Sequence, residues 1–476
     1  MVSGFVTLIV FVLALGGMIF LHELGHFIAA RWAKIEVEEF GFGLPPRAFG
    51  FWRTKGFLIF NKQRVEIPKN FDVGFDWTSV LKKTSVATVD QEGEKYILRT
   101  LEFGAEGKPT RTSARKIDQI IVRSNGEVVD ASLQTALSTE TVRIGRKNGA
   151  IEWKGEINEI HPGTLFSINW LPLGGFVRPK GENDPNIPGG LGAASPWKRL
   201  VVLFAGPLMN LLTAVIVFSF LISFEGISVP GSIKIDSIAG NSPAEQAGIQ
   251  AGDILISING QNVTEIDSAI AIIKANLDKP VEMVFDRNGE QVTLTATPLS
   301  TRKASEGALG VGLGYPTRPA TFIESVSGGA LVTGLQAATI LYLPVALIQG
   351  VIAPEDARFI GFKGIFDMFD VAVEEDVSSR QEAAAAPAGA AAPTPTNWTL
   401  NLIGVLSISL GVMNLLPIPA LDGGRILFTL PEILFRKRIP PQWENAVNGI
   451  AMLMLIGLML FVNIMDFVDP AKIPTP

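Results

Sequence analysis

The sequence contains no cysteine and only three histidines among its 476 residues. Disulfides and thiolate metal ligands are therefore excluded, and any metal site has to use histidine and carboxylate. Charged residues make up only 18% of the chain and the mean hydropathy is positive, which indicates a membrane protein with soluble parts. The net charge of -6 argues against nucleic-acid binding, because such an interface needs concentrated positive charge.

Two of the three histidines stand in one short motif, His22-Glu23-Leu24-Gly25-His26. On a helix, positions i and i+4 share a face, so both imidazoles can bind one metal ion. Glu23 then lies beside the open coordination position, where its carboxylate can accept a proton from water. The simpler alternative is a helix with two structural histidines.

This motif directly continues an uncharged apolar stretch, residues 1–21. Ionisable residues at membrane depth are costly and are functional candidates by default. We therefore predict a first transmembrane helix over residues 1–30, with both histidines toward its inner end. Arg31 and Lys34 follow it, and positive residues favour the cytoplasmic side, which places the N-terminus outside.

A carboxylate ends a later apolar run. Residues 398–424 are predicted to form the third transmembrane helix, which closes with Leu421-Asp422-Gly423. A zinc ion in a hydrolase takes three protein ligands plus water, and Asp422 supplies the third. In the predicted topology this helix and the first one both run inward, so Asp422 can meet the two histidines at one depth.

The predicted fold class is a multi-pass α-helical membrane protein with four transmembrane helices, a PDZ-like α+β domain and an inserted β-rich module. The second and fourth transmembrane helices are predicted over residues 196–225 and 446–465. Residues 330–352 are uncharged, but a crossing there would reverse the direction of residues 398–424, so we predict an interfacial or re-entrant helix. The remaining segments are membrane-associated stretches at 31–50 and 163–195, the inserted module at 51–162 and an Ala/Pro-rich linker at 381–397.

Several residues allow two interpretations. Residues 166–178 alternate like a strand that can pair with residues 40–51, either as a structural hairpin or as an edge that extends a substrate backbone. Asn210 lies within the second apolar run, where it can serve helix packing or the site. His161 is interpreted as a loop or surface histidine rather than a metal ligand.

Residues 229–298 contain a strand, a short helix with Ser242 at its start and Gly248 at its end, and a second strand with a turn. This pattern resembles a PDZ domain of the bacterial protease-associated type. The resemblance implies binding of peptide ends or extended segments by strand addition. The alternative is a steric gate that limits access to the membrane site.

The chain as a whole resembles the site-2 protease family of intramembrane zinc metalloproteases, in particular the bacterial regulator-of-sigma-E protease group. Besides the histidine motif and the PDZ-like segment, the resemblance rests on Phe40-Gly41-Phe42-Gly43, Leu171-Pro172-Leu173-Gly174-Gly175, Gly206-Pro207-Leu208-Met209-Asn210 and the stretch from Asn414 to Gly424.

The resemblance implies Zn²⁺ bound by His22, His26 and Asp422, with Glu23 as the catalytic acid and base. It also implies that Asn414 hydrogen-bonds the substrate backbone. The expected substrates are single-pass membrane proteins, such as anti-sigma factors already cut outside or remnant signal peptides. The expected location is the bacterial cytoplasmic membrane, with the active site near the cytoplasmic side and the PDZ-like domain outside. Gly174 and Gly175, in the strand that could take up substrate, are further substrate-binding candidates.

Two departures from the family pattern concern substrate choice and regulation. Residues 51–162 replace what is usually a short hairpin, and one PDZ-like segment stands where many members have two. A competing hypothesis is a catalytically inactive membrane scaffold that binds partners through the PDZ-like domain. A zinc carrier is a third possibility, but it would need more histidines and carboxylates along the spanning helices.

Overall fold

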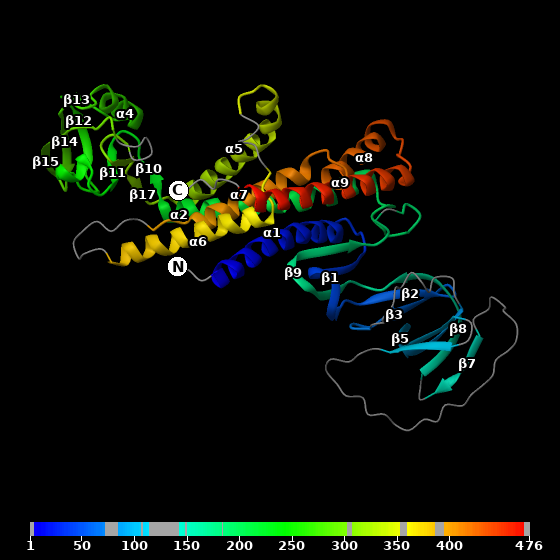
Figure 1. Ribbon diagram of the computed structural model, residues 1–476. Helices are drawn as coiled ribbons and strands as arrows, with labels where there is room; N and C mark the ends of the chain where they lie inside the picture. Colours follow the sequence, from blue (N-terminus) through cyan, green and yellow to red (C-terminus); the bar gives the residue numbers. More distant parts are fainter. Residues whose placement is uncertain are drawn as a thin grey trace. The chain divides into compact units, whose positions relative to one another are not determined.

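The computed structural model describes residues 4–71, 84–105, 108–113, 142–147, 150–182, 184–301, 307–352, 359–385 and 395–470 (Figure 1). The chain divides into two compact units. The first unit comprises Val12–Asn210 and Leu410–Leu458. The second unit comprises Met1–Phe11, Leu211–Ser409 and Met459–Pro476.

Five helices in the described part of the chain are long and apolar enough to cross a membrane. They are α1 (Gly4–Trp32), α2 (Pro196–Glu225), α5 (Phe322–Ile348), α7 (Trp398–Leu415) and α9 (Pro441–Val468). Four of them overlap the predicted spans. The fifth, α5, covers the segment predicted to be interfacial or re-entrant, so length and composition allow one span more than the predicted four.

The third predicted span is shorter than the sequence suggests. It was expected to continue to residue 424, but α7 ends at Leu415 and a new helix, α8 (Asp422–Phe435), begins at Asp422. Pro417 and Pro419 lie between them, and proline removes a backbone donor and disfavours a helical residue before it. The prolines therefore separate the apolar helix from the helix that starts with the carboxylate.

A long two-stranded hairpin dominates the first unit. Strands β1 (Val37–Arg53) and β9 (Leu165–Pro179) are antiparallel, with register shifts along their length. The predicted pairing of residues 40–51 with residues 166–178 is thus confirmed. Large apolar side chains are exposed on the hairpin, among them Phe42, Trp170 and Leu171. Exposed aromatic side chains of this kind suit a segment that lies against a membrane.

The first unit also contains a mixed seven-stranded sheet, in the part of the chain where the sequence predicts a β-rich module. Its strands are β2 (Gly56–Phe60), β3 (Gln63–Ile67), β4 (Thr84–Glu92), β5 (Lys95–Ala105), β6 (Lys108–Ser113), β7 (Val142–Lys147) and β8 (Ala150–His161). The order β2-β3-β5-β4-β8 closes on itself because β2 also pairs with β8. Trp153, Phe60 and Leu101 are fully buried inside this small barrel. Asn125-Gly126, a residue pair that favours a hairpin turn between two strands, lies outside the described residues.

His161 ends strand β8 at the junction of the barrel and the hairpin. Its Nδ1 makes a short contact with Glu36 Oε1, and Lys180 Nζ donates to Glu36 Oε2 at 3.0 Å. Burial alone would raise the pKa of the Glu36 carboxyl, but the hydrogen bonds from His161 and Lys180 outweigh it and hold the pKa below its usual range. His161 is therefore a half-buried hydrogen-bond partner of Glu36 at the end of β8, and it is not part of the group that could hold a metal.

The second unit contains the α+β domain that the sequence predicts. Its main sheet has the order β15-β14-β12-β11-β16, built from β11 (Ile233–Ile238), β12 (Ile254–Ile258), β14 (Val281–Arg287), β15 (Glu290–Ala296) and β16 (Val311–Gly314), with β13 (Gln261–Asn262) paired to β12. Helices α3 (Pro243–Gln246) and α4 (Ile266–Ala275) accompany it, and β10 (Ile227–Ser228) pairs with β17 (Thr317–Arg318). Phe285 and Ile258 lie fully buried in the core. Because β16 belongs to the main sheet, the domain continues past the predicted end at residue 298.

A charged helix that the sequence analysis did not identify, α6 (Phe362–Ala385), follows α5 in the second unit. Asp466 of α9 accepts hydrogen bonds from the Gly361 and Gly364 amides at the start of α6. Asp376 of α6 in turn accepts from the Trp398 and Thr399 amides that begin α7. These carboxylates satisfy amides that a helix start leaves unpaired. Because α6 continues to Ala385, the predicted linker begins later than residue 381, and residues 386–394 lie outside the described chain.

Candidate metal centre

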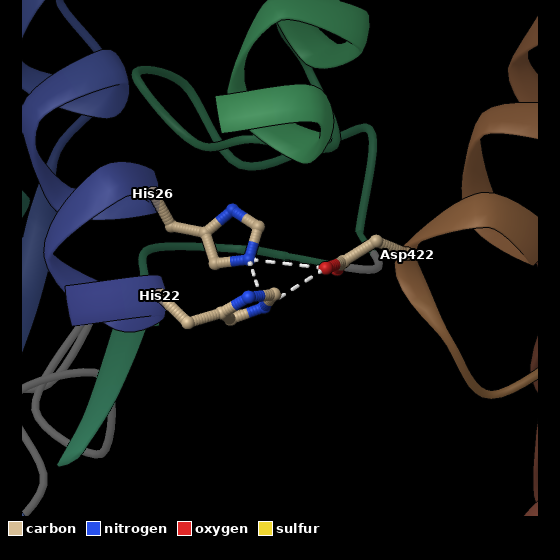
Figure 2. A group of neighbouring side chains, drawn as sticks. All are labelled: His22, His26 and Asp422. Atoms are coloured by element: carbon tan, nitrogen blue, oxygen red, sulfur yellow. Dashed lines mark hydrogen bonds and ion pairs between the residues drawn. The ribbon is translucent and has the colours of Figure 1, made fainter. Parts of the chain in front are cut away.

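Three of the predicted site residues meet in the first unit. Figure 2 shows the imidazoles of His22 and His26 on α1 directed at the carboxylate of Asp422, the first residue of α8. His22 Nε2 and His26 Nε2 lie 3.1 and 3.2 Å from Asp422 Oδ2, and 3.2 Å from each other. The histidines are 7% and 8% exposed, so bulk water contributes little to their solvation.

The donor set fits a tetrahedral metal ion. Bonds of about 2.0–2.2 Å to nitrogen and oxygen imply ligand-to-ligand separations of roughly 3.3–3.5 Å. The three observed separations fall just below that range. The lone pairs of two imidazole nitrogens and one carboxylate oxygen converge on one point. A single proton cannot bind all three, whereas one metal cation can. Among the described residues, these three form the one group of histidine and acidic side chains that could hold a metal.

Helix α2 forms the wall behind the two imidazoles. A Cβ atom at Gly206 would stand 2.3 Å from His26 Nε2 and 2.8 Å from His22 Nε2. On α1, a Cβ atom at Gly25 would stand 2.3 Å from the Ala205 carbonyl oxygen. Two glycines thus let the helices approach closely at the level of the metal ligands, as small residues do in membrane bundles.

The same face of α2 binds the outer nitrogen of each imidazole. His26 Nδ1 lies 2.7 Å from the Val202 carbonyl oxygen, and His22 Nδ1 lies 3.1 Å from the Asn210 amide. A carbonyl at Nδ1 fixes the tautomer whose Nε2 carries the free lone pair. The structure places Asn210 Nδ2 at His22 Nδ1, and the amide would fix His22 in the same way if it were turned so that its oxygen faced the ring. Asn210, which the sequence left open between packing and the site, therefore contacts His22 of the candidate metal centre.

Glu23 is held by the membrane-associated hairpin. Its Oε2 accepts a hydrogen bond from the Val177 amide of β9 at 3.1 Å. The strand therefore brings a backbone donor to the carboxylate that directly follows His22 in sequence. A fixed position is what a general base needs, because proton transfer requires hydrogen-bond reach.

The three predicted substrate-binding residues have structural roles of their own. A Cβ at Gly174 would stand 2.4 Å from Ile19, and one at Gly175 would stand 3.2 Å from Phe20, so both glycines let β9 lie against α1 just before His22. Asn414 Nδ2 donates to the Leu410 carbonyl one turn earlier in α7, at 2.9 Å. Contact of these residues with a substrate stays a prediction.

Comparison with known proteins identifies the family. The model described as Peptidase family M50 matches residues 10–60 and 156–458, which contain all three converging residues and Glu23. The chain belongs to peptidase family M50. The unmatched residues 61–155 contain strands β3 to β7, so the family model leaves most of the small barrel unmatched.

Relatives of this M50 peptidase extend over nearly the whole chain. Zinc metalloprotease RasP of Bacillus licheniformis is 27% identical over 465 residues, which cover 96% of this chain and 98% of RasP. RasP of Oceanobacillus iheyensis is 26% identical over 466 residues, covering 96% and 97% of the two chains. A protein of Clostridium perfringens whose name includes "zinc metalloprotease" is 32% identical over 317 residues, covering 64% and 84%.

Two parts of the M50 site were not assigned from the sequence. One is the close approach of Gly206 to the imidazoles, and the other is the hydrogen bond from the Val177 amide to Glu23. Each is a contact between residues more than 150 positions apart in the sequence. Only the Gly206 contact had a signal in the sequence, because Gly206-Pro207 inside an apolar helix indicates close helix contact.

Proposed function

We propose that this M50 peptidase is an intramembrane zinc endopeptidase that hydrolyses peptide bonds within the transmembrane segments of single-pass membrane proteins. The observation that carries the proposal is the convergence of His22 and His26, beside Glu23 in the apolar helix α1, with Asp422 at the start of α8. Metalloprotease names among the relatives support zinc as the metal. Remnant signal peptides and anti-sigma factors are the substrate classes that the family resemblance suggests.

In this proposal the two imidazoles and the Asp422 carboxylate hold Zn²⁺ as its three protein ligands. The ion, when bound, would act as a Lewis acid toward water and the scissile carbonyl. Glu23 takes the proton from the attacking water and returns it to the amine that leaves. Val177 keeps the Glu23 carboxylate in place, while the burial of the histidines restricts competing water.

A substrate helix hides its carbonyls in hydrogen bonds and has to unwind before cleavage. In this proposal an extended substrate segment adds to β9 next to Gly174 and Gly175 by backbone hydrogen bonds. Asn414 is the proposed side-chain partner of the substrate backbone. Cleavage that is unchanged by Asn414→Ala and by proline substitutions in residues 166–176 would remove this part of the proposal.

For the topology we propose four membrane crossings in the bacterial cytoplasmic membrane, with the α+β domain outside and the metal centre near the cytoplasmic side. Contacts within the second unit support a re-entrant α5. Its first turns pack on the C-terminal part of α2, where a Cβ at Gly329 would stand 2.5 Å from Ser219 Oγ. The chain that follows α5 returns to Asp466, near the C-terminal end of α9. Both α2 and α9 end outside in this topology, so the α5 segment enters and leaves on one side.

The test is cleavage of a tagged single-pass substrate in proteoliposomes by the wild type and by Glu23→Gln, with zinc content measured in both. We expect zinc in both proteins and cleavage only by the wild type. Zinc loss in His22→Ala would assign the ion to this centre. Equal function of wild type and Glu23→Gln, or a wild type without zinc, would favour the alternative of a catalytically inactive scaffold that binds peptides through its PDZ-like domain.

A further inference from the structure

The chain reaches Asp422 through a tight turn with an unusual residue. The Leu421 amide donates to the Ile418 carbonyl at 3.2 Å, which closes a four-residue turn with Pro419 in its second position. Ala420, in the third position, has a φ of +73°. These are features of a type II turn, whose third position needs positive φ and normally carries glycine or asparagine. Alanine is therefore held in a conformation that L residues rarely adopt.

The turn is joined to α9 by one side chain. Asn448 Oδ1 accepts a hydrogen bond from the Ala420 amide at 3.0 Å. This amide is free for such a bond because the turn itself uses the Leu421 amide. The bond therefore fixes the backbone at the residue whose φ is positive, two positions before the metal ligand.

The start of α8 is packed against the segment before it, since a Cβ at Gly424 would stand 2.4 Å from the Ile418 carbonyl oxygen, so the shape of the turn sets the direction of the helix. Its first flanking residue, Leu421, makes no side-chain capping hydrogen bond. Asp422 is the first residue of the helix, so a rotation of the preceding turn would swing its carboxylate relative to the imidazoles of α1. An ion pair between Arg425 and Glu182 restrains the helix one turn later, but it does not restrain the turn itself.

We propose that Asn448 is a positioning residue for Asp422. By binding the Ala420 amide it holds the left-handed turn, and the turn presents the Asp422 carboxylate to the metal. This inference rests on the proposed metal site. It adds to that site a residue of α9, a helix that contributes no ligand. It also assigns the orientation of the third ligand to the half-buried turn of residues 418–421.

The test measures the zinc dissociation constant of the purified full-length protein by competition with a chromophoric chelator. Residues that orient metal ligands typically change metal affinity 10–100-fold when removed. We expect Asn448→Ala to weaken zinc binding about tenfold. Asn445→Ala, an exposed asparagine of the same helix three positions earlier, is the matched control and should bind zinc like the wild type.

A second pair of variants tests the route through the turn. Glycine adopts positive φ without strain, so Asn448→Ala introduced into the Ala420→Gly background should weaken zinc binding less than about threefold. The double variant also keeps the test open if Asn448→Ala alone fails to fold. Unchanged zinc affinity in Asn448→Ala, or an equal loss in both backgrounds, would overturn the inference. A failure of the proposed metal site itself would look different. In that case the wild type would bind no zinc, or the zinc it binds would not be lost in His22→Ala.

Discussion

Substitution of Gly206 by alanine is predicted to disrupt metal binding while the protein stays folded. The added Cβ would stand 2.3 Å from His26 Nε2, 2.6 Å from His26 Cε1 and 2.8 Å from His22 Nε2. Ordinary contact needs roughly 3.5–4.0 Å, so at least one imidazole has to retreat by about 1 Å. A metal site tolerates about 0.2 Å in its ligand distances. A misplacement of about 1 Å near a reacting centre costs on the order of 100-fold in rate.

We therefore expect Gly206→Ala to lower both zinc affinity and cleavage rate about 100-fold or more. Helix stability works in the opposite direction, because alanine is favoured over glycine inside a helix by about 1 kcal/mol. The metal-free protein should consequently keep or slightly raise its melting temperature. Zinc affinity by chelator competition, cleavage in proteoliposomes and thermal unfolding of the metal-free protein separate these two effects.

The matched control is Gly17→Ala, in α1 and five residues before His22. An added Cβ at Gly17 meets nothing within 4 Å, so this variant should retain wild-type zinc affinity. The prediction is refuted if Gly206→Ala binds zinc as tightly as the wild type. Equal damage in Gly17→Ala would show that glycine in the apolar helices, and not the wall behind the imidazoles, is what matters.

Three further predictions concern other hydrogen bonds and ion pairs. Asn210→Ala should weaken zinc binding about 10–100-fold in the chelator assay, and wild-type affinity would contradict a role in orienting the imidazole. Glu36→Gln should lower stability by about 1 kcal/mol at pH 7. The folded-state pKa of Glu36 lies below its usual value of 4.5, so the stability difference between wild type and variant should be largest above pH 4.5 and shrink as the pH falls below it. Thermal unfolding of both proteins over a series of pH values measures this. Arg287→Ala leaves the Asp253 carboxylate, 1% exposed, without its bidentate partner and should destabilise the α+β domain by about 3 kcal/mol in limited proteolysis. Lys234→Ala, which breaks an exposed pair, should cost less than about 1 kcal/mol there.

The three residues that converge at the candidate metal centre could be predicted because their signals are local. Two histidines four residues apart, and an aspartate that ends an apolar run, need no knowledge of the fold to be recognised. The apolar helices were equally accessible, since an uncharged stretch of about 20 residues is itself the signal. Helix α2 begins and ends at the residues predicted for it, Pro196 and Glu225.

What the sequence did not reveal depends on how these helices cross. The role of Gly206 follows from the distance between α1 and α2, and the role of Asn448 follows from the contact of α9 with a turn. Helix α6 was missed for a different reason. It carries many acidic residues and a weak apolar pattern. Its start is fixed by the contact of Asp466 with the Gly361 amide, and Asp376 in its interior binds the Trp398 amide of α7, and neither contact has a local signature.

The barrel, most of which the family model leaves unmatched, is joined to the hairpin through neighbouring strands. The chain leaves hairpin strand β1 into β2 and returns through β8 into β9, and β2 pairs with β8 just as β1 pairs with β9. The insertion therefore begins and ends on neighbouring antiparallel strands, where the cost of closing a longer loop grows only logarithmically with its length. Its apolar side chains surround Trp153 inside a sheet that closes on itself, so the barrel does not borrow its core from the hairpin. The hairpin can then keep the Val177 amide on Glu23 without support from the core of the barrel.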